Sequence, residues 1–171
     1  ELNRAVDRSA VVHTDDLAWH EPFFAWGHML REEILVTLHR GEGVRFQPPA
    51  WGLHGREGVI EVAAEVDLVV IEGVGASQRE FEHYVDASIW VQSDFQEAER
   101  RGIARDMAQG VNGDREQTIA FWHEWMAHEV RFLAEQRPWE RACLVVAGSP
   151  TIDLDEGQFA VAPAPSNNPW L

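Results

Sequence analysis

Three acidic residues follow apolar segments of the chain, a placement typical of ligand-binding sites in α/β proteins. Asp15 and Asp16 come shortly after the apolar residues 10–13, and Glu72 directly follows the apolar residues 66–71. Ligands of open α/β sheets bind at the carboxyl ends of the strands. A carboxylate there can accept a proton from a hydroxyl group or hold Mg²⁺ through water. We interpret these residues as a general base with metal or substrate contacts, and capping of a helix or turn is the alternative.

A cluster of arginines provides the complementary charge. Arg100, Arg101 and Arg105 lie in one helical segment, and the spacing of four residues puts Arg101 and Arg105 on the same helix face. Two guanidinium groups on one face can clamp a polyphosphate. The glycine-containing residues 109–114 follow, so residues 100–115 are interpreted as a mobile lid. The alternative is ordinary surface pairing, for example between Glu97 and Arg101.

The histidines and loop tryptophans give weaker signals. His123 and His128 resemble the ligand pair of a zinc protease, but they are five residues apart instead of four and so point in different directions. We therefore do not expect a metallohydrolase. Trp19 and Trp51 fall in expected loops, where they could stack on a nucleobase or simply pack.

The composition limits the classes of protein and partner. The chain has 171 residues, 45% of them apolar, so we expect one folded domain spanning residues 1–171. The formal net charge of −15 argues against binding to nucleic acid or anionic membranes. No apolar run reaches the length of about 18 residues needed for a membrane span, and no secretory signal is visible. The single cysteine, Cys143, indicates a reducing compartment, and we expect the cytoplasm.

Apolar strands alternate with helical segments along the chain, which predicts an α/β fold with a mainly parallel sheet. The run at residues 66–71 is apolar enough to be a central strand that is buried on both faces. The other strands are expected at residues 10–13, 44–47, 59–62, 88–92, 143–147 and 159–162, with 44–47 and 59–62 forming a hairpin, and the helices at 23–38, 78–84, 94–108 and 116–136.

The order and spacing of several motifs resemble the uridine kinase group of P-loop nucleoside kinases, especially compact bacterial uridine-kinase-like proteins. The resemblance covers most of the chain and rests on residues 11–19 (VVHTDDLAW), 47–51 (QPPAW), 68–75 (LVVIEGVG), 100–106 (RRGIARD) and 137–141 (RPWER). It implies a three-layer P-loop kinase-like fold, with ATP and Mg²⁺ as cofactors and a uridine- or cytidine-like nucleoside as phosphate acceptor.

The resemblance also implies roles for particular residues. Asp15 matches the catalytic base of the family, Asp16 lies beside it as a metal or substrate contact, and Glu72 matches the Walker B-like acid near Mg²⁺. Arg101 and Arg105 match the lid arginines that meet the ATP phosphates, with Arg100 beside them as a further cofactor contact. The turn formed by Gly148, Ser149 and Pro150 falls where the last loop of the family passes near the adenine.

One part of the family pattern has no counterpart in the sequence. A P-loop kinase needs a first strand followed by G-x-x-x-x-G-K-[ST], and all fourteen basic residues here are arginines. About thirty residues, one βα unit, would correspond to this part. We therefore interpret the chain as N-terminally truncated, and we expect it to bind ATP poorly as it stands. The expected function is phosphoryl transfer to a nucleoside-like hydroxyl. The alternative is a non-catalytic nucleotide-binding or interaction module. The sequence leaves open whether the protein forms a homo-oligomer.

Overall fold

The computed structural model describes residues 6–163 of the chain, a mixture of helices and small β-sheets. The chain divides into two compact units, with the boundary between Asp86 and Ala87. Each unit is described by itself. The α/β class is confirmed, with both parallel and antiparallel strand pairs.

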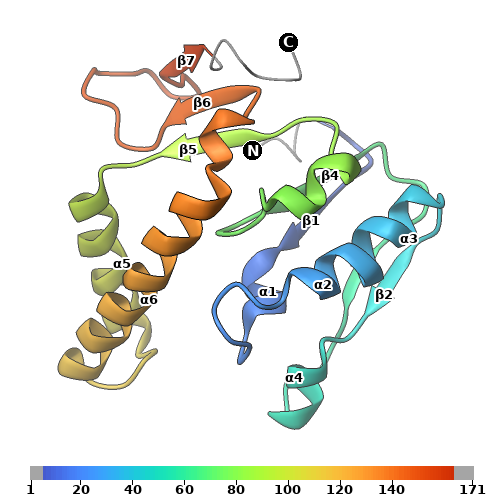
Figure 1. The fold of residues 1–171 in the computed structure, drawn as a ribbon, viewed down its shortest axis with the longest axis horizontal. Helices are drawn as coiled ribbons and strands as arrows, with labels where there is room; N and C mark the ends of the chain where they lie inside the picture. The colour runs from blue at the N-terminus through green and yellow to red at the C-terminus, as the bar shows by residue number, and fades with distance from the viewer. Residues whose placement is uncertain (1–5, 164–171) are drawn as a thin grey trace. The chain divides into compact units, whose positions relative to one another are not determined.

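The first unit contains a parallel pair of strands that carries the predicted acidic residues at one end. Strand β1 (Ser9–His13) pairs with β4 (Leu68–Glu72), and the register runs from Ser9↔Leu68 to His13↔Glu72 (Figure 1). The prediction of a central strand buried on both faces is wrong, because β4 pairs only with β1 among the described strands and its apolar residues are half-buried. The carboxyl ends of the two strands nevertheless lie side by side.

The expected hairpin is present beside this pair. Strand β2 (Val44–Phe46) is antiparallel to β3 (Ile60–Val62), and Arg45 forms an ion pair with Glu61 across them at 3.3 Å. The short helix α4 (Pro49–Leu53) lies in the connection between the two strands and was not predicted. It begins at a proline, which is well suited to the first turn because it has no N–H group to satisfy.

One continuous helical segment covers the core of the first unit. It consists of α2 (Gly27–Met29), a π-helical stretch η2 (Leu30–Leu35) and α3 (Val36–His39). We predicted a start at Phe23, but Phe24 has a left-handed backbone with φ of 62°, which no helix can continue through. Two short helices complete the unit, α1 (Thr14–Ala18) and the 3₁₀-helix η3 (Arg79–Tyr84). The main buried residues are Val12, Leu17, Trp26, Met29, Leu30, Ile34, Leu35, Val44, Trp51, Ile60, Val62 and Phe81.

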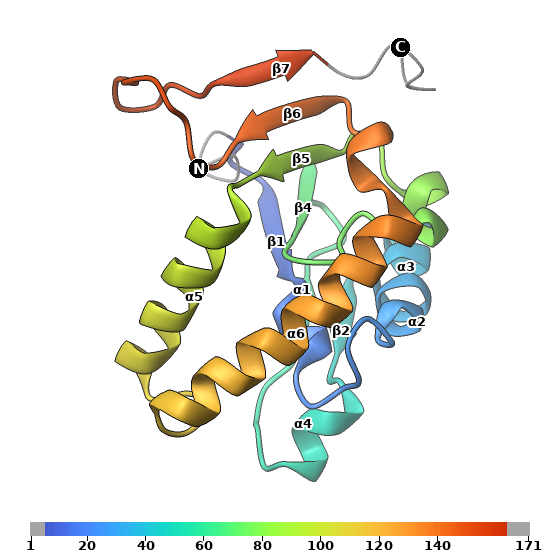
Figure 2. The same ribbon diagram turned by 60° about the vertical axis from the view of Figure 1, so that its left-hand side comes forward.

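The second unit combines a three-stranded sheet with a helical hairpin (Figure 2). Strand β5 (Ile89–Gln92) is parallel to β6 (Leu144–Ala147), and β7 (Val161–Pro163) is antiparallel to β6. Helix α5 (Phe95–Gln109) and helix α6 (Arg115–Gln136) form the hairpin, and the 3₁₀-helix η4 (Pro138–Glu140) leads on to β6.

Local sequence signals explain the ends of the two long helices. The side chain of Asp94 caps α5 as predicted, accepting a hydrogen bond from the backbone N–H of Glu97 at 2.9 Å. Asp114 and Gln117 form a reciprocal capping box at the start of α6. The apolar residues of α6 are not all buried, since Val130 is 51% exposed. No helix within residues 6–163 combines the length and the hydropathy required to cross a lipid bilayer.

Candidate functional site

The structure brings Asp15 and Glu72 to the same edge of the β1–β4 pair. Asp15 lies in α1, two residues beyond the end of β1, and Glu72 ends β4. Asp15 is exposed and makes no hydrogen bond or ion pair with any of the described residues. The Glu72 side chain is 52% exposed, and one of its oxygens, Oε1, accepts a hydrogen bond from Nδ1 of His13. Asp15 is therefore free to accept a proton, and Glu72 keeps one oxygen for a further contact.

Asp16 has a different environment from its neighbour. Its carboxylate is 2.5 Å from a terminal nitrogen of Arg56, and its backbone carbonyl accepts a hydrogen bond from the indole of Trp51 at 2.9 Å. The guanidinium group of Arg56 stacks on the Trp51 ring, 3.6 Å from its centroid. Asp16 therefore anchors the segment that contains α4, and Trp51 packs in the core instead of standing free for a ligand.

A cluster of rings lies just beyond α1 in the same unit. The imidazoles of His20 and His54 are stacked with centroids 3.8 Å apart, and Trp19 meets both rings edge to face. His20 adopts a left-handed backbone with φ of 61°, which is uncommon for a residue other than glycine. The segments that follow α1 and α4 are thus joined by ring contacts, and Trp19 and His20 follow Asp15 closely in sequence.

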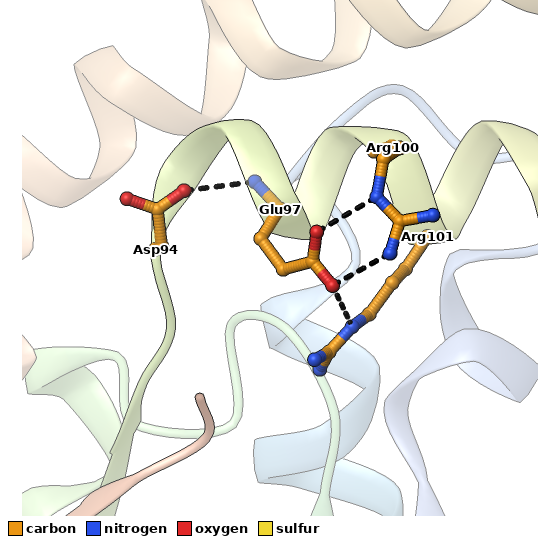
Figure 3. Close-up of polar contacts among 4 residues, drawn as sticks. All are labelled: Asp94, Glu97, Arg100 and Arg101. Carbon is orange, nitrogen blue, oxygen red and sulfur yellow. Dashed lines mark hydrogen bonds and ion pairs between the residues drawn. The ribbon is translucent and has the colours of Figure 1, made fainter. Parts of the chain in front are cut away.

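Two of the three predicted arginines share a carboxylate on α5 (Figure 3). Glu97 Oε2 accepts a hydrogen bond from Arg100 Nε at 2.8 Å, and Glu97 Oε1 accepts from Arg100 at 2.7 Å and from Arg101 Nε at 2.6 Å. The hydrogen bonds from Arg100 and then Arg101 lower the pKa of Glu97 to about 2. The surface-pairing alternative is therefore present. Arg101 uses only Nε in this contact, so its two terminal nitrogens have no partner among the described residues.

The third arginine belongs to a network around Asp106, a carboxylate that is only 4% exposed. Arg105 donates to Asp106 Oδ1 at 2.9 Å through Nε, while Oδ2 accepts from Trp122 at 2.8 Å and from Asn112 at 3.2 Å. The backbone N–H of Val111 also donates to the carbonyl of Asp106 at 3.1 Å. The residues after α5, which we expected to be a mobile loop, are thus tied to α5 and α6.

One residue of the predicted adenine-contacting turn, Ser149, lines a cavity of about 660 Å³ in the second unit. Ser149 faces this cavity, and its buried hydroxyl has no hydrogen-bond partner among the described residues. Gly148 packs closely against the end of β5, because a Cβ atom there would lie 2.2 Å from Ser93 Oγ. The cavity is lined by Gln92, Ser93, Asp94, Phe95, Val145, Ala147, Ser149, Ala160, Val161 and Ala162.

The predicted residues therefore form two groups, one in each unit. Asp15, Asp16 and Glu72 lie at the β1–β4 edge, whereas the arginines and the turn at residues 148–150 belong to the second unit. No group of three or more metal-ligating side chains occurs within residues 6–163. His123, one of the two histidines of the zinc-protease-like motif, pairs with Glu99 of α5 at 3.1 Å.

Sequence analysis missed three residues that contact the predicted ones. His13 could have been found, because it ends β1 and a parallel partner strand must end beside it. Arg56 and Asp106 could not, since the first reaches Asp16 across forty residues and the second depends on the packing of α5 against α6. A scan against models of known protein families gave no match, and neither did a search of curated protein sequences.

Proposed function

We propose that this protein transfers a phosphoryl group from ATP, with Mg²⁺, to a hydroxyl of a nucleoside-like small molecule, and that its fold is the three-layer fold of P-loop kinases. The observation that carries the proposal is the unpartnered carboxylate of Asp15 beside the carboxyl ends of two parallel strands, with Glu72 ending the second strand. This edge is where open α/β sheets bind their ligands.

Asp15 is the proposed general base. Its exposed, unpaired carboxylate can accept the proton of an acceptor hydroxyl as that oxygen attacks the terminal phosphorus of ATP. The proposal gives Asp16 a supporting role, because its ion pair with Arg56 fixes the segment next to Asp15. A general base of this kind contributes a factor of about 10² to 10⁴ to the rate.

Glu72 fits a contact to Mg²⁺ better than Asp16 does. Mg²⁺ in phosphoryl-transfer enzymes keeps several waters and takes one or two carboxylates together with the phosphates of the substrate, so it needs no cage of protein ligands. Each carboxylate uses one oxygen in a contact, with His13 for Glu72 and with Arg56 for Asp16, but the Glu72 side chain is 52% exposed and that of Asp16 only 29%. When bound, the ion would neutralise charge on the phosphates.

The second unit supplies candidate contacts for ATP. The terminal nitrogens of Arg101 can form a fork with two phosphate oxygens, and Arg105 and Arg100 lie on the same helix. The cavity lined by Ser149 has the volume of a small-molecule site, and the proposal places the adenine there, next to Gly148 and Pro150 in sequence.

The strands also favour the proposed P-loop kinase-like fold. Each of β4 and β5 has an edge without a partner among the described strands, although both are apolar and pair in parallel on their other side. Parallel strands of this kind normally lie inside larger sheets. The free edges are compatible with the additional strand that leads into the phosphate-binding loop of a P-loop kinase.

The test is acceptor-dependent release of ADP by the full-length product of the encoding gene, with uridine, cytidine and non-nucleoside alcohols as acceptors. We expect turnover with a nucleoside, and a fall of about 10² to 10⁴ in kcat for Asp15→Asn. Asp86→Asn is the matched control, because Asp86 is an exposed aspartate of the same unit without partners among the described residues. No turnover, or equal rates for the two variants, would reject the proposal.

A second candidate is a non-catalytic nucleotide-binding module. Its support is that most of the proposed site residues already have internal partners, since Asp16, Arg101 and Arg105 form ion pairs and Glu72 is hydrogen-bonded to His13. Titration calorimetry with ATP and Mg²⁺ separates the two candidates. Binding without turnover favours the module, and absence of binding by the full-length protein rejects both.

A further inference from the structure

We propose that Thr14 is a positioning residue for the proposed reaction, because its hydroxyl ties the segment that carries Asp15 to the loop that carries Glu72. The inference rests on the proposed function for its kinetic meaning, but the tie itself is a feature of the first unit. Thr14 is the first residue of α1 and lies directly between β1 and Asp15.

The hydroxyl of Thr14 is buried and bonded to the neighbouring loop. The residue is 1% exposed, and its Oγ1 donates a hydrogen bond to the backbone carbonyl of Val74 at 3.1 Å. Val74 follows Glu72 by two residues, so this bond joins the two strand ends beyond the last pair of the ladder, His13↔Glu72. A buried hydroxyl with one defined acceptor holds both loops in a single arrangement.

Gly73 is shaped to admit this contact. A Cβ atom at Gly73 would lie 2.1 Å from Oγ1 of Thr14, and the φ of Gly73 is 119°, a value that other residues rarely adopt. Only glycine allows the hydroxyl to approach the loop this closely. Gly73 therefore lacks the side chain that would block the contact, and Thr14 supplies the hydroxyl that makes it.

The other side of the loop is packed against an aromatic ring. Gly75 has φ of 83°, and a Cβ atom there would lie 2.8 Å from the buried ring of Trp26. The loop is thus confined by apolar packing on one side, and on the other it is held by the hydrogen bond from Thr14. Without that bond, the loop loses a side-chain hydrogen bond to the β1–α1 segment.

The tie matters because it acts on both proposed functional carboxylates at once. Asp15 is adjacent to Thr14 in sequence, and the hydrogen bond between His13 and Glu72 joins the neighbouring strand ends. A shift of either loop changes the spacing between a proton acceptor and a metal contact. Phosphoryl transfer depends on such positioning, and a misplacement of about 1 Å can cost about a hundredfold in rate.

The test compares Thr14→Val, which keeps the shape and removes the hydroxyl, with Thr14→Ser, which keeps the hydroxyl. Thr118→Val is the matched control, because Thr118 is also a buried threonine, 0% exposed, whose hydroxyl donates to the carbonyl of Asp114 at 2.8 Å in the second unit. Amide hydrogen exchange of residues 73–76 and steady-state kinetics are measured for the full-length protein.

We expect Thr14→Val to accelerate amide hydrogen exchange at residues 73–76 by about tenfold, the usual effect of losing one net hydrogen bond. The same variant should lower kcat by at least about tenfold, while the KM for the acceptor changes by less than about twofold. Thr14→Ser should restore both values. Thr118→Val should accelerate exchange only around residues 111–118 and leave kcat unchanged.

The inference is overturned if exchange at residues 73–76 is the same in Thr14→Val and the wild type, or if Thr14→Ser is as defective as Thr14→Val. An equal loss of kcat in Thr118→Val would also overturn it, because general destabilisation would then explain the effect. Absence of turnover in the wild type rejects the proposed function instead, and the exchange comparison then still decides whether Thr14 ties the two loops.

Discussion

The buried carboxylate of Asp106 gives the sharpest prediction about stability. Asp106→Asn replaces an oxygen acceptor by an amide of nearly the same shape. The wild-type carboxylate accepts from Arg105 on Oδ1 and from Trp122 and Asn112 on Oδ2. Since every partner is a donor, the new NH₂ group must face at least one donor in either orientation of the amide.

The expected cost follows from these contacts. Hydrogen bonds to a charged group contribute about 1.5–3 kcal/mol each, and leaving buried donors without an acceptor adds desolvation. The Arg105 side chain is 62% exposed, so its own charge stays hydrated when the partner is removed, and that bond contributes at the low end. We therefore expect Asp106→Asn to lower the free energy of unfolding by about 3 kcal/mol.

The assay is urea unfolding followed by circular dichroism at 222 nm, which reports the long helices α5 and α6. With an m-value of about 2 kcal/mol/M, the midpoint should fall by about 1.5 M. Asp114→Asn is the control, because asparagine caps a helix as well as aspartate does and the midpoint should hardly move. A midpoint for Asp106→Asn that lies within the error of the control would refute the reasoning.

Three further predictions concern the same unit and use the same unfolding assay. Gly102→Ala should disrupt the α5–α6 hairpin and lower the midpoint, because the new Cβ would lie 2.0 Å from the Trp122 ring; an unchanged midpoint would mean that the helices are not in contact there. The pKa of Glu97 is lowered to about 2 from 4.5, so its contribution to stability is complete above pH 4.5 and is lost as the pH falls toward 2. Glu97→Gln should therefore flatten the acid limb of the midpoint profile, and an acid limb as steep as that of the wild type would contradict the pairing. Burial raises the pKa of Glu129 to about 7, so its protonated form favours folding below pH 4.5 and this advantage disappears as the pH rises through 7. Glu129→Gln should then be more stable than the wild type at pH 8, by about 1 kcal/mol after allowance for partial exposure, and no more stable at pH 4.

The local elements were predictable because their signals are local. Asp94 caps α5 at the predicted residue, and the apolar runs that end near His13 and Glu72 form strands within two residues of the expected bounds. Parallel strand pairs were expected from the alternation of apolar strands with helical segments, and the β1–β4 pair is parallel. These features depend on periodicity and capping, which a sequence carries directly.

The features that escaped prediction depend on contacts between distant residues. The ion pair of Asp16 with Arg56 and the network around Asp106 require the packed chain, so no spacing rule reveals them. Asp16 illustrates the consequence, because two adjacent aspartates with the same sequence signal have different environments, one paired and one free. Residue type and order suggest a site, but only packing shows which carboxylate is available.

The π-helical stretch at Leu30–Leu35 and the left-handed backbone of Phe24 also lay beyond sequence reasoning. Trp26, Leu30 and Ile34 recur at four-residue spacing within the expected helix 23–38, and all three are buried. The spacing fixes which side of the helix is buried but not its exact start or its hydrogen-bond pattern.

The most direct test of the proposed chemistry is ³¹P NMR of ATP, Mg²⁺ and a nucleoside incubated with the full-length protein and, in parallel, with its Asp15→Asn variant. The account predicts a growing nucleoside monophosphate signal matched by ADP with the wild type, and a rate lower by about 10² to 10⁴ with the variant. ADP formed together with inorganic phosphate instead of a monophosphate, or equal rates for the two proteins, would contradict it.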